Sequence, residues 1–235
     1  MAERVSTPRT TPVLPLEQGS LSTRAYHALR EAMIGGRFRP GERLVMHDIA
    51  GQLGTSVTPV REACLRLVSE GGLELRSGRF PTVPEMTMAR YMEVRLIRLE
   101  LEGLAAQIAA EHATPDDIAE LRRLQAVFEA ADHSGDPEAA FTCNRDVHFG
   151  IYRLSRLDML VAHIENLWVS MGPMLTVFFN EGAHSYVGGA EHRAAIDALE
   201  AGDGAKARAA MQRDIRLGGE DFLRFLRTHE RFSVG

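Results

Sequence analysis

Apolar residues recur every three or four positions along most of this chain, a spacing typical of amphipathic helices. In the first third this spacing predicts three short helices, at residues 22–34, 46–53 and 58–70. Two alternating segments then follow, at 73–76 and 80–83, on either side of a Ser-Gly-Arg turn. Alternation around a glycine predicts a β-hairpin. Three helices followed by a small hairpin predict a winged helix-turn-helix.

After Pro84 the helical period dominates to the end of the chain, with few glycines and no strand alternation. We expect six further helices, at about 87–111, 115–131, 137–154, 158–179, 183–201 and 205–229. The Gly172-Pro173 pair is expected to kink the fourth of them, because proline has no N–H to donate. The predicted fold is therefore mostly α: a winged helix followed by an all-α antiparallel bundle of about six helices.

These patterns divide the chain into three parts. Residues 1–19 are rich in proline, serine and threonine and have no apolar period, which predicts a flexible arm. Residues 20–84 form the predicted winged helix. Residues 85–235 form the predicted helical domain.

The segment between the second and third helices has the features of a helix-turn-helix. Gly54 suits the left-handed residue that ends a helix. Either Ser56 or Thr58 can cap the next helix, and Pro59 fits its first turn. Arg61 follows on a helix that, lying in the major groove of DNA, would present its first turns to the base edges.

Charge is distributed unevenly, as expected for a DNA-binding domain joined to a different module. Residues 1–83 carry 11 basic and 8 acidic residues, whereas the remainder carries 16 basic and 24 acidic residues. Two distant cysteines argue against a disulfide framework or a cysteine zinc cluster. No apolar run approaches the roughly 20 residues needed to span a bilayer, and no signal-peptide core is visible. A cytoplasmic protein without a membrane partner is expected.

The quoted motifs resemble two known families. The run from Arg39-Pro40-Gly41-Glu42-Arg43-Leu44 to Thr58-Pro59-Val60-Arg61-Glu62-Ala63 is similar to the DNA-binding domain of the GntR family of bacterial transcription regulators. The second part resembles the all-helical effector domain of the FadR-like subfamily, the FCD domain. Its marks are Arg98-Leu99-Glu100-Leu101-Glu102, Val147-His148 and Glu191-His192. The resemblance implies homodimers, operator DNA, and a small-molecule ligand, often a carboxylate, inside the bundle.

The candidate DNA-binding residues lie on the second and third helices, on the segment before them and on the wing. They are Arg43, His47, Ser56, Thr58, Arg61, Arg66, Ser77, Gly78 and Arg79. Arginine suits guanine edges and phosphates, while hydroxyls near a helix N-terminus suit phosphates. The alternative for each single arginine is a solvated helix face paired with Glu62 and Glu70.

Two positions depart from the GntR pattern. Val57 stands where the family commonly has arginine, and His47 stands where it often has arginine. The loss of one bidentate contact removes roughly 1–3 kcal/mol of base discrimination. We therefore expect an operator that differs from those of relatives, or weaker binding that depends on Arg61, Arg43 and the wing.

A second group of candidates is expected in the bundle. Asn144 and His148 are four residues apart, so both project from one face of a helix. The resemblance matches these two residues, with His192 and Asp214, to positions that bind a divalent metal in many FCD domains. There the last position is usually histidine. Two imidazoles, a carboxylate and an amide oxygen can hold zinc, nickel or manganese. The alternative is a metal-free pocket in which the same groups bind the effector.

Arg98 is the candidate effector-binding residue, since a guanidinium can hold a carboxylate by two hydrogen bonds. The alternative is an ion pair with Glu102, its neighbour one helical turn away. Taken together, the sequence predicts a ligand-responsive transcription regulator, expected to be a repressor, that binds a pseudo-palindromic double-stranded DNA operator as a homodimer.

Two other functions are compatible with the same modules. One is a metal-dependent hydrolase, for which His148, His192 and Asp214 could activate water; however, the chain offers no matching motif for a general base. The other is an architectural DNA-binding dimer with an empty bundle. A ferritin-like enzyme is disfavoured, because Glu181 and His184 have no second Glu-x-x-His to complete a di-iron site. We expect no enzymatic activity.

Overall fold

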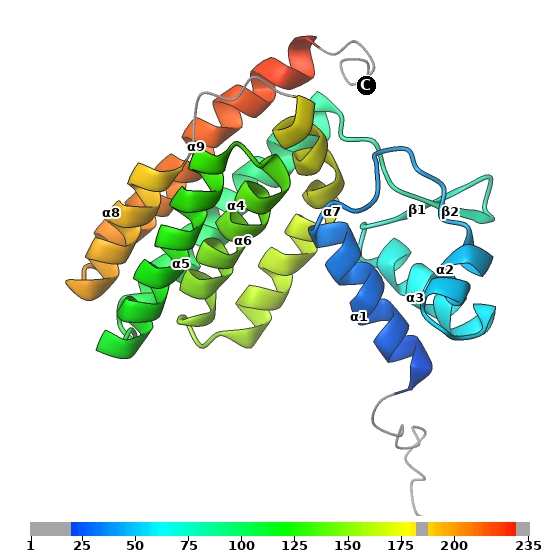
Figure 1. Ribbon diagram of the computed structural model, residues 1–235, viewed down its shortest axis with the longest axis horizontal. Coiled ribbons are helices and arrows are strands. Elements are labelled where there is room, and N and C mark those ends of the chain that lie inside the picture. Colours follow the sequence, from blue (N-terminus) through cyan, green and yellow to red (C-terminus); the bar gives the residue numbers. More distant parts are fainter. Residues whose placement is uncertain (1–19, 182–187, 229–235) are drawn as a thin grey trace, which may run out of the picture.

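The computed structural model describes residues 20–181 and 188–228 (Figure 1). The predicted N-terminal arm and His184 therefore lie outside the described residues. In the described part the protein is mostly helical, as predicted, with a single two-stranded sheet. The described helices include none that is long and apolar enough to cross a membrane.

The N-terminal part contains three helices and a hairpin, as the sequence predicts. They are α1 (Leu21–Ile34), α2 (Met46–Gln52), α3 (Val57–Ser69), β1 (Glu74–Arg76) and β2 (Phe80–Thr82). Gly54 has φ +63°, the left-handed conformation that glycine adopts without a steric cost. Between the antiparallel strands, Ser77 and Gly78 have φ values of +53° and +66°, which suits a tight hairpin turn.

The winged helix has a compact apolar core between α1 and α3. Leu29 and Met33 of α1 meet Val60 and Leu67 of α3, and all four side chains are at most 3% exposed. Just before α2, the Leu44 N–H donates to the Pro81 carbonyl, which joins this segment to β2. Helix α3 also contacts β2 directly, so the recognition helix and the wing lie side by side.

In the part of the chain after residue 87 that the structure describes, six helices form the bundle. They are α4 (Met88–Ala109), α5 (Pro115–Ser134), α6 (Pro137–Arg153), α7 (Asp158–Glu181), α8 (Gly189–Glu200) and α9 (Gly204–Thr228). Local sequence sets several of their ends. Thr114 and Asp117 form a reciprocal capping box at the start of α5, and Gly135 ends that helix with φ +71°. The centre of the bundle contains Trp168, Tyr152 and Phe141, which are almost completely buried.

Helices α7 and α8 add detail to the prediction. α7 runs as one helix through Gly172 and Pro173, where the kink is expected. α8 begins at Gly189, after Gly188 with φ +73°, whereas the sequence places the start near residue 183. Residues 183–187 lie outside the described part of the chain.

Helix α1 packs directly against α7, so the winged helix contacts the bundle (Figure 1). The contact is close because both sides use glycine. A Cβ atom added to Gly172 would lie 2.2 Å from the Met33 carbonyl oxygen, and one added to Gly36 would lie 1.5 Å from Thr176 Oγ1. Beside this contact, Arg30 Nη1 lies 2.5 Å from Glu165 Oε2, and Arg30 Nη2 donates to Asn166.

This close contact generates a first prediction. Gly172→Ala should lower the free energy of unfolding by about 1–3 kcal/mol, the usual cost of an overpacked contact, because the methyl group meets backbone carbonyls that cannot rotate away. Chemical denaturation measures the change. Gly51→Ala is the matched control, since it lies on helix α2 and its Cβ would meet nothing within 4 Å. Equal stability of the two variants would show that the α1–α7 contact is not as tight as described.

Candidate nucleic-acid interface and metal centre

The N-terminal end of α3 carries three of the predicted DNA-binding residues, and all three are exposed. Ser56 is the N-cap residue, and its hydroxyl makes no capping hydrogen bond. Thr58 and Arg61 follow on the exposed side of the helix. The hydroxyls and the free N–H groups of the first turn are therefore available to an anion such as a DNA phosphate.

A groove of about 350 Å³ separates α3 from the wing. Arg61 and Arg79 line it together with apolar side chains that include Leu65 and Leu75. Nearby, the Arg43 guanidinium lies over the Phe80 ring, 3.6 Å from its centroid. Arg61 of α3 and Arg79 of the wing thus line one groove together with Gly78, while Arg43 lies against Phe80 of β2.

Arg66 and Val57 have other surroundings. Arg66 Nε lies 3.2 Å from Glu70 Oε1, and its guanidinium covers the Tyr26 ring at 3.6 Å. This is the ion-paired arrangement expected as the alternative to DNA contact, although the side chain is still half exposed. Val57 is partly buried and packs against the core. His47 is exposed in the first turn of α2.

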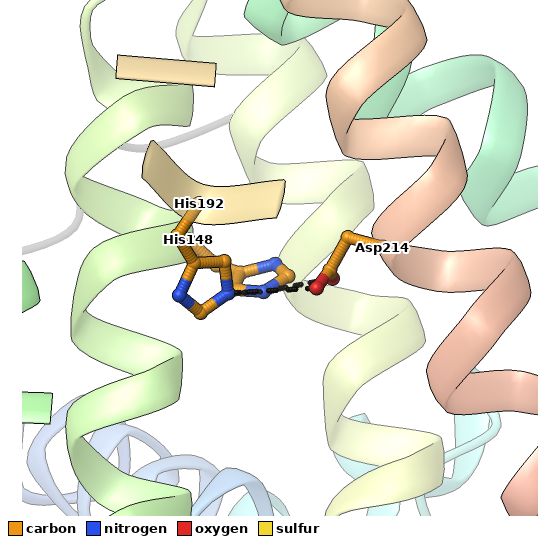
Figure 2. Close-up of side chains that lie close together, drawn as sticks. All are labelled: His148, His192 and Asp214. Carbon is orange, nitrogen blue, oxygen red and sulfur yellow. Dashed lines mark hydrogen bonds and ion pairs between the residues drawn. The ribbon is translucent and has the colours of Figure 1, made fainter. Parts of the chain in front are cut away.

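In the bundle, three predicted residues from three helices meet (Figure 2). His148 lies on α6, His192 on α8 and Asp214 on α9, and all three are buried. His148 Nε2 lies 3.1 Å from His192 Nε2 and 3.2 Å from Asp214 Oδ2. His192 Nε2 lies 3.6 Å from Asp214 Oδ1. Among the described residues, this triad is the one group of three or more His, Cys, Asp or Glu side chains with the spacing of metal ligands.

The spacing fits a bound metal ion. Zinc binds imidazole nitrogen at about 2.0–2.1 Å, so two ligands of a tetrahedral zinc lie roughly 3.3 Å apart. The three distances between ligand atoms of the triad, 3.1, 3.2 and 3.6 Å, are close to that value. The fourth candidate, Asn144, lines the adjacent cavity with His148 and Asp214. The residues present therefore fit a divalent ion that two imidazoles and one carboxylate would hold.

The two histidines have opposite electrostatic surroundings. Burial lowers the pKa of His148, but Asp214 and Glu102 more than compensate and raise it to about 9. Burial lowers the pKa of His192 to about 4, against the opposing effect of Asp214. Without a metal, His148 is therefore cationic at neutral pH, with a proton on each ring nitrogen, and pairs with Asp214. His192 is neutral.

Next to the triad, Glu102 is completely buried and accepts hydrogen bonds from three side chains. Arg98 Nε donates to Oε1 at 2.5 Å and Arg98 Nη2 to Oε2 at 3.2 Å. Tyr152 donates to Oε2, and Trp168 Nε1 donates to Oε1 at 3.1 Å. Burial alone would raise the pKa of Glu102, but the Arg98 charge, the nearby His148 (Nδ1 3.8 Å from Oε2) and the Arg98 hydrogen bonds lower it to about 2.

The Arg98–Glu102 pair is therefore formed, as in the alternative expected for Arg98. Arg98 also lines the cavity, where its Nη1 lies 3.6 Å from the Met171 sulfur, a weak acceptor. Sequence reasoning missed two other residues at this site. Tyr152 follows His148 at i+4, a spacing that could have revealed it, whereas Gln125 comes from α5 and carries no sequence signal.

The triad opens into a cavity of about 90 Å³. Polar groups at its wall include Arg98, Asn144, His148 and Asp214, and much of the rest is apolar or aromatic. A cavity of roughly 150 Å³ can take benzene, so a ligand here is either small or displaces lining side chains.

Comparison with known proteins agrees with this architecture. Residues 21–80 match the model of bacterial regulatory proteins of the gntR family, and residues 93–217 match the FCD domain model. The chain therefore belongs to the GntR family of bacterial transcription regulators and carries an FCD domain, which confirms the resemblance predicted from the sequence.

Two relatives and one solved structure illustrate the similarity. The HTH-type transcriptional regulator McbR of Escherichia coli is 41% identical over 156 residues, 66% of this chain and 71% of McbR. A probable D-xylose utilization operon transcriptional repressor of Paenarthrobacter nicotinovorans is 30% identical over 187 residues, 77% of this chain and 79% of the relative. The structure of E. coli McbR/YncC aligns with a TM-score of 0.82 and 33% identity, over 88% of this chain and 99% of that chain. The protein is a transcription regulator rather than an enzyme.

The triad generates the second prediction. Purified protein reconstituted with zinc, nickel or manganese should retain close to one ion per chain, and His148→Ala should lose it, because the variant lacks the central imidazole. Elemental analysis after gel filtration measures the ratio. His163→Ala, which removes an exposed histidine of α7, should retain the ion. Ion-free wild-type protein after reconstitution would contradict the prediction.

Proposed function

We propose that this GntR regulator binds a pseudo-palindromic operator as a homodimer and represses transcription until a small molecule enters the cavity of the FCD domain. The observation that carries the proposal is the position of α7. One side of this helix lines the cavity and the other side contacts the winged helix. A ligand that moves α7 would therefore act on the DNA-binding domain directly.

The cavity side of α7 presents Trp168, Met171, Leu175 and Phe178 to the ligand space. The other side presents a different set of residues to the winged helix. Glu165 and Asn166 hold Arg30, Gly172 packs against the end of α1, and a Cβ on Gly72 would lie 2.5 Å from Val169 Cγ1. Because packed interfaces shift between discrete arrangements rather than deform smoothly, a change at one side can reposition the other.

The energetic requirement is simple. A ligand can shift the placement of the winged helices only if it binds one placement more tightly than another. If the ligand releases DNA, then DNA must weaken ligand binding by the same factor. Repression is supported by the name of the P. nicotinovorans relative, a probable transcriptional repressor. In a homodimer bound to its operator, the two recognition helices would lie about one DNA turn apart.

A divalent metal fits this proposal as part of the ligand site. His148, His192 and Asp214 would hold the ion, with Asn144 at the wall of the same cavity. The ion would supply a positive charge that binds an anionic ligand such as a carboxylate. Zinc, nickel and manganese all accept imidazole and carboxylate ligands.

The DNA-binding half of the proposal can be tested at Arg61. Arg61→Ala should abolish specific operator binding but retain weak, salt-dependent binding to unrelated DNA, because a base-reading contact is lost while other cations remain. The operator is first selected from random duplexes with the wild-type protein, and anisotropy titrations at fixed salt then give the affinity and the number of chains bound. Arg123→Ala, an exposed arginine of α5, is the control. Unchanged specific affinity of Arg61→Ala would refute the role of this residue.

The ligand half can be tested with pairs of compounds. Small carboxylic acids and their primary amides, which have the same shape without the charge, are screened by thermal unfolding. We expect an acid, but not its amide, to raise the unfolding temperature and to change operator affinity. At 100 times the dissociation constant, a ligand stabilises the folded state by about 2.7 kcal/mol. Stabilisation that leaves operator affinity unchanged would contradict the proposed regulation.

A further inference from the structure

The two imidazoles of the triad present the same ring nitrogen, Nε2, to each other and to Asp214. A neutral imidazole carries a proton on only one nitrogen, and the hydrogen bond of the other nitrogen decides which. The groups that contact the two Nδ1 atoms therefore control what the triad can bind.

For His148, Nδ1 lies 2.8 Å from the Tyr152 hydroxyl oxygen. That hydroxyl donates its single proton to Glu102, a buried carboxylate that can only accept. The remaining lone pairs of the tyrosine oxygen face His148, so Nδ1 of His148 must be the donor in this contact. The Nδ1 proton leaves Nε2 as the nitrogen that can ligate a metal.

For His192, Nδ1 lies 3.1 Å from Gln125 Oε1. The orientation of this amide is not arbitrary. Its NH₂ group donates to Glu129 Oε1 at 2.7 Å and to the Gly189 carbonyl at 3.3 Å, and both partners are acceptors. The amide oxygen must therefore face His192, and Nδ1 of His192 must carry the proton.

We infer that Tyr152 and Gln125 are positioning residues, which fix both imidazoles in the Nδ1–H form and turn two Nε2 lone pairs towards Asp214 to form the cation site. This inference rests on the proposed metal site and adds the residues that orient its ligands. When both rings are neutral, the Nε2 atoms and the Asp214 oxygens all present lone pairs within 3.1–3.6 Å of one another. Such a group of acceptors needs a positive charge at its centre, which either an added proton on His148 or a bound metal ion can supply.

The experiment compares zinc affinities by competition with a chromophoric chelator. Tyr152→Phe and Gln125→Leu should each weaken zinc binding by about 10–100-fold, the usual effect of removing a group that orients a ligand. Tyr26→Phe is the matched control. It loses the same kind of hydrogen bond, from a buried tyrosine to Glu70 at 2.7 Å, in the other domain. It should bind zinc as the wild type does.

Two further readouts separate ligand orientation from a general loss of stability. With Co²⁺ in place of zinc, the visible absorption bands of Tyr152→Phe and Gln125→Leu should shift, and those of Tyr26→Phe should not. In the zinc-loaded wild type, ¹⁵N–¹H correlation spectra of the imidazoles should show the proton on Nδ1 of both rings, a result that does not depend on any variant folding.

The outcomes can be distinguished. Wild-type affinity in both variants, or a proton on Nε2 of either zinc-loaded ring, would overturn this inference and leave the metal site intact. A wild-type protein that binds neither zinc nor Co²⁺ would overturn the proposed metal site, and this inference with it.

Discussion

The ion pair between Arg98 and Glu102 is the interaction on which the centre of the bundle depends. An unpaired carboxylate in an apolar interior is strongly unfavourable, so Glu102 must be matched by donors on every side. It is matched by Arg98 on its own helix, Tyr152 on α6 and Trp168 on α7. Three helices are therefore fixed relative to one another by a single carboxylate. The same carboxylate also orients the tyrosine hydroxyl that contacts His148.

Helix α7 links this centre to the DNA-binding domain. Its Trp168 donates to Glu102, while one helical turn further on Gly172 allows α1 to approach within backbone contact. A larger residue at position 172 would both meet the α1 carbonyls and crowd the following proline. On one side of α7, Trp168 is hydrogen-bonded to Glu102 beside the cavity. On the other side, Gly172 lets α1 pack closely, so the cavity and the winged helix lie close together. This proximity is what a switch between ligand and DNA requires.

Much of the fold could be predicted from local signals. The Gly54 turn, the Thr114–Asp117 capping box and the Ser77–Gly78 hairpin are set by neighbouring residues, so the sequence was sufficient to place them. His148, His192 and Asp214 could also be nominated, but only through a family resemblance, because they come from three helices. Gln125 could not be found at all. Its role depends on how α5 lies against α8, and no spacing along the chain encodes that contact.

The sequence by itself determined the kind of protein: a winged helix with an exposed Arg61, followed by a helical domain with paired polar positions. These features follow from periodicity and turn chemistry, which act over a few residues. Only the tertiary structure decided which side chains share a proton or face a common centre. It paired Arg98 with Glu102, turned Arg66 towards Glu70 and fixed the hydrogen bonds of both imidazoles. Such choices depend on burial, because a polar group that has lost its water must take whichever partner the packing of distant segments provides.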